Sequence, residues 1–241
     1  MQPRATTSVL ALATAAAVAA VAACSDSDNP VAAPNANTTV RFFNASSTLV
    51  LDVAQNGTVG SGNGNIPFGA ATTCMKVNEA NPQLSIRAAG STSDLTGFTP
   101  SFTAGNTYTV LVTGTGSAPA FAALDDQFTP SGANTAGVRI VNATTDASPG
   151  AGTWDIYVNP AEPLGTPNAT AVTRNSASPF LTVPAEQTNM VRLTNTGQTT
   201  PLQDIAVPSL AAGTATTIVV TDPTTAGRTT LEAFTLPPCP T

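Results

Sequence analysis

The sequence predicts an all-β fold made of two tandem immunoglobulin-like antiparallel β-sandwich domains, which follow a signal peptide and a flexible tether. Three observations predict it. Short runs rich in β-branched residues recur between clusters of Gly, Pro, Asn, Ser and Thr. No window after residue 23 carries an extended helical period with capping signals. The same series of predicted strands occurs twice in the same order.

Residues 1–23 have the pattern of a lipoprotein signal peptide. Arg4 precedes an uncharged, mostly apolar run from Val9 to Ala23, which is shorter than the roughly 20 residues that a membrane-spanning helix needs. The run ends in Val21-Ala22-Ala23-Cys24, which is similar to the lipobox of bacterial lipoproteins, whose cysteine receives a diacylglycerol. The resemblance implies lipidation at Cys24 and anchoring in the bacterial cell envelope, and Ser25 after the cysteine resembles the signal for delivery to the outer membrane. The alternative is a secreted protein with an incidental cysteine.

Residues 24–38 are predicted to be a flexible tether. They are mostly Ser, Asp, Asn, Pro, Ala and Thr, and such a composition buries too little apolar surface to offset the entropy of the chain. A coil of this length has an end-to-end distance on the order of 20 Å. We therefore expect the tether to hold the folded part away from the lipid surface.

The composition excludes several classes of function. The net charge is −6, the single lysine is Lys76, and removal of the signal peptide would take away one more basic residue. An acidic chain of this kind has no electrostatic footprint for nucleic acid or for an anionic bilayer. The sequence has no histidine, which excludes Ser-His-Asp and Cys-His catalysis and the commonest zinc ligand. No catalytic residue, metal or cofactor is predicted.

Two cysteines remain besides Cys24. In an oxidising compartment an even remainder most simply pairs, so a disulfide bond is predicted between Cys74 and Cys239. Prolines around Cys239 restrict the tail to extended conformations, which reduces the entropy lost when it reaches back to the first domain. The prediction therefore places the two domains side by side. Two separate buried thiols are the alternative.

The repeat defines the predicted domains: residues 39–129 and residues 138–241, with a polar Gly/Pro linker at 130–137. "VRFFNASSTLVLDV" from Val40 aligns with "VRIVNATTDASPGAGTWDIYV" from Val138, and three later segments match in the same order. Each copy has about 90 to 100 residues, an ordinary size for one domain. The clearest predicted strands are residues 108–114, 154–159, 189–195 and 216–222.

The second copy carries a family resemblance. Its opening is similar to that of the bacterial domain of unknown function 4397 family, which begins Val-Arg-x-x-(His/Asn)-Ala and continues through an Asp-Ala turn to Asp-(Val/Ile)-Tyr-Val. Thr145 replaces the family's usual proline before Asp146, and the first copy lacks the Asp-Ala turn. The resemblance implies an extracytoplasmic β-sandwich, often in tandem and often on lipoproteins, with no established reaction. The matching residues are Val138, Arg139, Asn142, Ala143, Asp146, Ala147, Asp155, Ile156, Tyr157 and Val158.

Polar residues of the repeat form the predicted structural motif. Arg41 with Asp52, and Arg139 with Asp155, are expected either to pair across neighbouring strands or to anchor turns. Asn44 and Asn142 precede polar turns and are expected to hydrogen-bond their backbone. The motif comprises Arg41, Asn44, Asp52, Arg139, Asn142, Asp146, Asp155 and Tyr157.

Two further interpretations concern binding. Asp125 and Asp126, with Asp146 elsewhere, are candidate Ca²⁺ ligands, but adjacent acids are more often solvated and no calcium-loop pattern is present. Trp154 and Tyr157 are candidate sugar-stacking residues. Because they fall on opposite faces of one strand, Trp154 is expected in the core.

The functional hypothesis is a membrane-anchored envelope lipoprotein with a non-catalytic binding, adhesion or structural role. Its partners are the membrane, through the N-terminal lipid, and an unknown protein or glycan ligand, with no nucleic acid. The alternative is a carbohydrate-binding module or a carboxylate-dependent envelope glycoside hydrolase.

Overall fold

The computed structural model describes residues 38–78, 82–145, 152–223 and 230–239, which all belong to one compact unit, Asn35–Thr241. Every regular element among these residues is a β-strand, which confirms the predicted all-β class. Within the described part of the chain, no helix is long and apolar enough to cross a membrane. The predicted signal peptide, Cys24 and the tether up to residue 37 lie outside the described residues.

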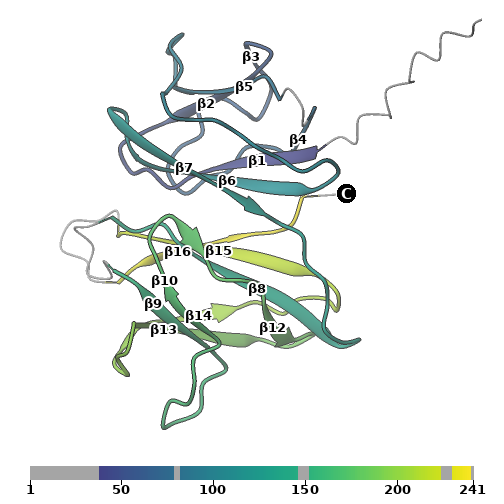
Figure 1. Ribbon diagram of the computed structural model, residues 1–241, viewed down its shortest axis with the longest axis vertical. Coiled ribbons are helices and arrows are strands. Elements are labelled where there is room, and N and C mark those ends of the chain that lie inside the picture. The colour runs from purple at the N-terminus through teal and green to yellow at the C-terminus, as the bar shows by residue number, and fades with distance from the viewer. Residues whose placement is uncertain (1–37, 79–81, 146–151, 224–229, 240–241) are drawn as a thin grey trace, which may run out of the picture. The chain divides into compact units, whose positions relative to one another are not determined.

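The first half of the unit is a sandwich of two sheets (Figure 1). One sheet has the strand order β4-β1-β6-β7 and the other has the order β3-β2-β5. The strands are β1 (Thr38–Asn44), β2 (Leu51–Gln55), β3 (Thr58–Val59), β4 (Met75–Val77), β5 (Leu84–Ala88), β6 (Thr107–Thr115) and β7 (Ala118–Asp125).

The second half is also a sandwich. Its sheets have the orders β11-β8-β15-β16, with β12 also paired to β8, and β10-β9-β13-β14. Strand β8 begins at Thr135, within the predicted linker 130–137. The strands are β8 (Thr135–Asn142), β9 (Trp154–Val158), β10 (Ala169–Val172), β11 (Ser176–Ala177), β12 (Leu181–Pro184), β13 (Asn189–Asn195), β14 (Pro201–Val207), β15 (Ala215–Thr221) and β16 (Glu232–Leu236).

The two sandwiches share a strand arrangement that includes one parallel pair each. Strand β1 runs parallel to β6, and β8 runs parallel to β15, so the sheets are mixed rather than purely antiparallel. The register is also equivalent, because Arg41 lies opposite Thr109 and Arg139 lies opposite Thr217. On its other edge, β6 pairs antiparallel with β7, and β15 likewise pairs antiparallel with β16.

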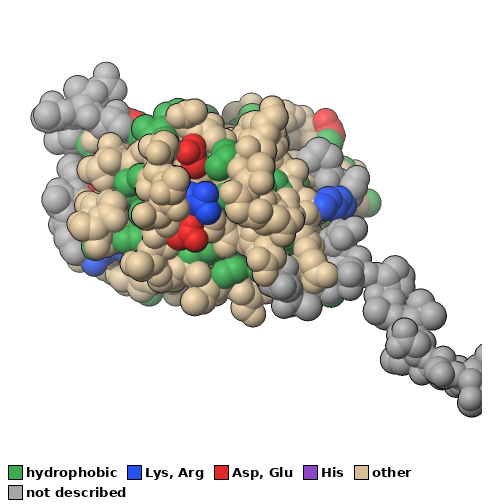
Figure 2. Space-filling view, turned by 90° about the horizontal axis from the view of Figure 1, so that it is seen from above, with side chains coloured by type: hydrophobic (Ala, Val, Ile, Leu, Met, Phe, Trp, Pro, Cys, Tyr) green, Lys and Arg blue, Asp and Glu red, His purple; other side chains and the backbone are tan. Residues whose placement is uncertain are grey.

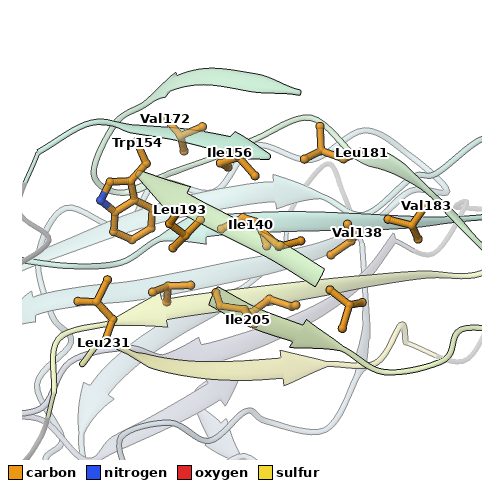
Figure 3. Packing of buried hydrophobic residues seen from close by; sticks show 14 of the residues in the cluster. Val138, Ile140, Trp154, Ile156, Val172, Leu181, Val183, Leu193, Ile205 and Leu231 are labelled. Atoms are coloured by element: carbon orange, nitrogen blue, oxygen red, sulfur yellow. The ribbon is translucent and has the colours of Figure 1, made fainter. Parts of the chain in front are cut away.

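Each sandwich has its own apolar core, which follows from alternation along the strands. In β9, Trp154 and Ile156 point into the core of the second sandwich, where they meet Ile140 and Leu193 (Figure 3). Trp154 is fully buried, as predicted. The first core is built from residues including Val40, Phe42, Leu51, Val53, Ile86, Val110 and Val112.

The central strands are buried on both faces. All seven residues of β1 are buried, because residues that point away from the core of the first sandwich meet the second sandwich. We call this contact, between the sheet of β1 and β6 and the sheet of β8 and β15, the joint (Figure 1). Its buried apolar residues are Phe43, Ala45, Leu111 and Leu124 from the first half, and Val141, Ala143, Val219 and Leu236 from the second.

Candidate functional site

The joint contains a charged centre formed by Arg41, Arg139 and Asp126. Arg41 lies between Val40 and Phe42 on β1, so strand alternation directs its side chain away from the core and into the joint. Arg139 holds the equivalent position on β8. Both arginine side chains are about 95% buried, at 5% and 4% exposure.

Each arginine contacts the threonine opposite it in the parallel register. Arg41 Nε donates a hydrogen bond to Thr109 Oγ1 at 2.9 Å, and Arg139 Nη2 donates one to Thr217 Oγ1, also at 2.9 Å. These contacts hold each guanidinium against its own sheet. Thr109 and Thr217 occupy equivalent positions, but Arg41 makes this contact through Nε and Arg139 makes it through Nη2.

The carboxylate of Asp126 is shared by both arginines. It forms an ion pair with Arg139 Nη2, and Arg41 Nη2 lies 3.8 Å from its Oδ2. Thr109 Oγ1 donates a hydrogen bond of 2.6 Å to the same Oδ2. Two guanidinium groups therefore face one carboxylate, and the three side chains together carry one excess positive charge. Burial lowers the pKa of Arg41, with the Asp126 carboxylate opposing this effect and Arg139 adding to it.

The arginines also reach across the joint to the opposite sandwich. Arg139 Nη1 donates a hydrogen bond to the carbonyl of Asp125, which ends β7, at 2.6 Å. Arg41 Nη1 donates one to the carbonyl of Pro237, just after β16. Each arginine thus binds the end of the last strand of the other sandwich. The centre therefore holds the two sandwiches in one orientation.

Within the described part of the chain, one polar side-chain atom of the centre has no hydrogen-bond partner. Arg139 Nε is buried and makes no hydrogen bond, while the guanidinium carbon lies 4.6 Å from the centre of the Phe180 ring. At this separation the cation is attracted to the face of the aromatic ring, which offsets part of the cost of burial.

A disulfide bond adjoins the centre. Cys74 and Cys239 are bonded, with their Cα atoms 5.9 Å apart, which confirms the predicted pair. The bond connects the segment before β4 of the first sandwich to the segment after β16 of the second. Hydrogen bonds, apolar contacts and a covalent bond therefore all join the two sandwiches.

A groove of about 560 Å³ opens beside the disulfide at the joint. This volume is within the range of small-molecule sites, which often lie between domains. Asp126 contributes both to the groove and to the charged centre. The groove is lined by Thr107, Asp126, Gln127, Phe128, Gly213, Thr214, Ala215, Pro238 and Cys239.

The expected pairs of Arg41 with Asp52 and of Arg139 with Asp155 do not form. Strands β1 and β2 belong to opposite sheets of the first sandwich, and β8 and β9 belong to opposite sheets of the second. The arginines point into the joint, while the aspartates lie beyond the other sheet and cannot reach them. The pairing prediction is therefore wrong.

The aspartates instead anchor turns, which was the other expectation. Asp155 accepts hydrogen bonds from the backbone N–H groups of Ala171 and Gly197, at 3.1 and 2.9 Å. Asp52 accepts equivalent bonds from Asn65 and Gly90, at 2.7 and 2.9 Å. In each sandwich one carboxylate thus connects two loops.

The asparagines anchor backbone as predicted. Asn142 donates to the carbonyls of Gly152 and Val172, and its oxygen accepts from Thr144. Asn44 makes the same kind of contacts in the first sandwich, to the carbonyls of Leu49 and Ile66 and from Ser46 N–H.

The remaining motif residues are Tyr157 and Asp146. Tyr157 is 7% exposed on the side of β9 opposite Trp154, and it lines a shallow pocket with the loop after β9. Asp146 lies outside the described residues.

The role of Asp126 is not apparent from the sequence. Adjacent acids were expected to be solvated, and Asp125 is indeed exposed, but the Asp126 side chain is only 7% exposed. The strand register places Pro237 and Pro238 of the second copy at the positions of Asp125 and Asp126, so the second copy supplies no equivalent carboxylate. Among the described residues, no three His, Cys, Asp or Glu side chains form a metal-binding group.

Surface charges are sparse. Figure 2 shows a face covered mainly by uncharged side chains, with a small charged group near its middle. Two exposed clusters carry ion pairs: Arg87 with Asp94, and Arg192 with Asp204 and Glu162. The hydrogen bond from Arg192 lowers the pKa of Asp204, and that from Arg87 lowers the pKa of Asp94.

Two solved structures are similar to this chain at a low level. One is the family 26 carbohydrate-binding module CBMbc of Eubacterium rectale Amy13K in complex with maltoheptaose, with 13% identity, coverage of 85% of this chain and 98% of that chain, and a TM-score of 0.28. The other is described as alpha-glucan binding by a streptococcal virulence factor, with 11% identity, coverage of 82% and 97%, and a TM-score of 0.26. No curated protein matches the chain. Residues 38–148, which include the first sandwich and strand β8, match the model of the family described as domain of unknown function (DUF4397), the family that the sequence resembles.

Proposed function

We propose that the protein is a lipid-anchored lipoprotein of the bacterial cell envelope, in which two copies of one sandwich domain act as a single non-catalytic module for binding, adhesion or envelope structure. The observation that carries the proposal is the Cys74–Cys239 bond. Disulfides persist in oxidising compartments such as the periplasm and the cell surface. This favours export, and it agrees with the signal peptide and lipobox read from residues 1–24.

The contacts of the repeated polar residues support a module that is built for rigidity. Asn44, Asn142, Asp52 and Asp155 are engaged with backbone groups of their own sandwiches. The arginines are engaged at the joint. Residues that recur in both halves are thus used to hold turns and to fix orientation, which suits a scaffold that presents its outer surface.

The aspartates of the two exposed ion pairs are unsuited to the acid step of glycoside hydrolysis. A glycosidase requires one carboxylic acid whose pKa is raised so that it is protonated near neutral pH. Asp94 and Asp204 have pKa values shifted in the opposite direction, because each accepts a hydrogen bond from an arginine. The alternative of a carbohydrate-binding module or envelope hydrolase calls for a direct test.

Anchoring is tested by fractionation of Cys24→Ser. We expect the wild-type protein in the membrane fraction, and the variant either in the soluble fraction or retained as an uncleaved precursor that lacks lipid. Metabolic labelling with a fatty acid separates these outcomes from true anchoring. If the Cys24→Ser variant is found in the membrane fraction and incorporates the fatty acid as the wild type does, the lipid anchor is refuted. Ser25→Asp tests delivery to the outer membrane in the same fractions.

Binding is tested with a glycan array, with envelope protein fractions and with a panel of chromogenic glycosides. We place the ligand in the joint groove, so Gln127→Trp should abolish binding by filling it, because the side chain of Gln127 is exposed there. Gln198→Trp is the matched control, since Gln198 is exposed outside the groove. Turnover of a glycoside that is lost in a single Asp→Asn variant would overturn the non-catalytic proposal.

A further inference from the structure

The aromatic ring of Phe128, in the segment after β7, is held in place at the edge of the joint groove. Gly137 on β8 has no side chain, and a Cβ added there would lie 2.6 Å from Cε2 of Phe128. The ring of Phe180 lies on another side, with the two ring centres 5.5 Å apart. The ring is thus positioned by contacts within the protein, and it also lines the groove.

The glycine that makes room for this ring stands inside a strand, where glycine is normally unfavourable. Gly137 pairs with Ala215 in the parallel register. The equivalent residue of the first sandwich is Thr39, which pairs with Thr107. Glycine within a strand often marks a place where another group approaches the backbone closely. The second sandwich therefore lacks a side chain on β8 that the first sandwich has on β1, and Phe128 occupies the space.

The lining of the groove offers a ligand no unpaired charge. Among the residues that line it, Asp126 alone is ionised, and its carboxylate is already engaged by Arg139 and Thr109. The guanidinium groups of Arg41 and Arg139 are buried and do not line the groove. A charged ligand would lose water here without gaining a partner of opposite charge, which costs more than burying a neutral polar group. The groove therefore favours an uncharged ligand.

Neutral groups that can both donate and accept hydrogen bonds lie around the ring. Gln127 is exposed and carries a side-chain amide, and Thr107 and Thr214 carry hydroxyl groups. The Thr214 hydroxyl donates to the carbonyl of Ala211 at 2.7 Å, which leaves the lone pairs of its oxygen as acceptors. The exposed ring of Pro238 adds apolar surface. The lining thus combines one fixed aromatic ring with apolar surface and with groups that suit hydroxyl partners.

We propose that the joint groove binds a neutral saccharide with one sugar ring stacked on Phe128, which rests on the binding function proposed above and names its ligand class. A sugar ring has a face of C–H groups that packs on an aromatic ring, and an edge of hydroxyl groups that each donate and accept. The groove, at about 560 Å³, has the size of a small-molecule site and holds a short segment of an oligosaccharide. A proline-rich peptide also binds aromatic grooves, but it presents carbonyl acceptors rather than hydroxyl groups and matches this lining less well.

Phe128→Leu is the decisive variant, because it keeps an apolar side chain and removes the flat ring. The affinity of the full mature chain for the saccharide should fall roughly fivefold to tenfold. Gly137→Ala should also weaken binding, because the added Cβ displaces the ring without removing it. Two variants outside the groove serve as matched controls and should keep the wild-type affinity. They are Phe102→Leu, whose ring contacts Tyr108, and Gly165→Ala, where no atom lies within 4 Å of the added Cβ.

The probe is chosen on an array of neutral oligosaccharides printed next to uronic-acid and sulfated ones, and calorimetric titration of the full mature chain then measures its affinity. We expect the tightest ligand to be neutral and to lose affinity in Phe128→Leu and Gly137→Ala but not in the controls. A wild type that binds only anionic saccharides or none, or an affinity unchanged in Phe128→Leu, would overturn the proposal.

The same experiments separate this proposal from the function on which it rests. If an envelope protein binds the wild type but not Gln127→Trp, and no saccharide binds, the saccharide assignment is wrong and the groove remains a non-catalytic binding site. If the bound saccharide is cleaved, the saccharide assignment stands and the non-catalytic function is wrong.

Discussion

Arg41 and Arg139 occupy equivalent positions in the two sandwiches and share the single carboxylate of Asp126. Each also donates to the carbonyl at the end of the last strand of the opposite sandwich. The two arginines are thus equivalent by the repeat, whereas Asp126 has no equivalent in the second sandwich. The stability of the joint therefore depends strongly on Asp126.

Asp126→Asn should destabilise the folded protein by about 3–5 kcal/mol, because it leaves two buried guanidinium groups without a carboxylate. Urea denaturation of the oxidised protein measures this loss. Asp94→Asn, whose side chain is 54% exposed, serves as the control and should change stability little. A loss as small as that of the control would mean that the charged centre contributes nothing to folding.

Replacing the whole centre with apolar residues should be far less harmful than removing the aspartate alone. The triple variant Arg41→Met, Arg139→Met, Asp126→Leu removes all three buried charges together, and such replacements are often neutral or stabilising. We expect its unfolding free energy to lie within about 2 kcal/mol of the wild type. A triple variant less stable than Asp126→Asn would show that the charges stabilise the joint in their own right.

Gly69→Ala should destabilise the joint by packing as well as by backbone strain. Gly69 has a φ of +75°, and an added Cβ would lie 2.7 Å from Cζ of Phe234. The Phe234 ring is held against Phe43 and Phe68, with ring centres 5.7 and 5.5 Å away, so it has little room to move. Gly57→Ala is the matched control, since its φ is +76° and no atom lies within 4 Å of its added Cβ. Gly69→Ala should lose about 1–3 kcal/mol more than Gly57→Ala by urea denaturation.

Reduction of the Cys74–Cys239 bond should lower the stability of the whole unit. The two cysteines are 165 residues apart in sequence, and the chain-entropy model gives at most about 5 kcal/mol for a loop of that length. Cys74→Ser with Cys239→Ser should unfold at a lower urea concentration than the oxidised wild type and at the same concentration as the reduced wild type. Labelling of denatured, non-reduced protein should find no free thiol at either position. Stoichiometric labelling at both would contradict the bond.

Acid should weaken the folded state partly through Asp204. Arg192 holds the folded pKa of Asp204 below its ordinary value of 3.8, so the pair stabilises the protein above that pH. The stability is lost as the pH falls below 3.8 and through the lower folded pKa. Between pH 5 and pH 2 the unfolding free energy of the wild type should therefore fall more steeply than that of Asp204→Asn. Parallel curves would show that this pair does not contribute to acid unfolding.

Several features could be predicted from the sequence because they depend on local periodicity or on pairing within one turn. Alternation along residues 154–158 placed Trp154 in the core, and Asn44 and Asn142 bind the turns that follow them. The duplicated order of strands predicted two sandwiches of one architecture. The bond between Cys74 and Cys239 could be predicted because only these two cysteines remain besides Cys24, and an oxidising compartment favours their pairing.

The partners of Arg41 and Arg139, the burial of Asp126 and the position of the Phe128 ring were decided only by the tertiary structure. Alternation shows that Arg41 points away from Val40 and Phe42, but it does not show whether that side faces water or a second sheet. Consecutive strands β1 and β2 lie in opposite sheets, so nearness in sequence favoured the wrong partner, Asp52. The joint brings together residues far apart in sequence, such as Arg41 and Pro237, which are 196 positions apart. Their contact depends on how two complete sandwiches pack, and no pattern confined to a single strand contains that information.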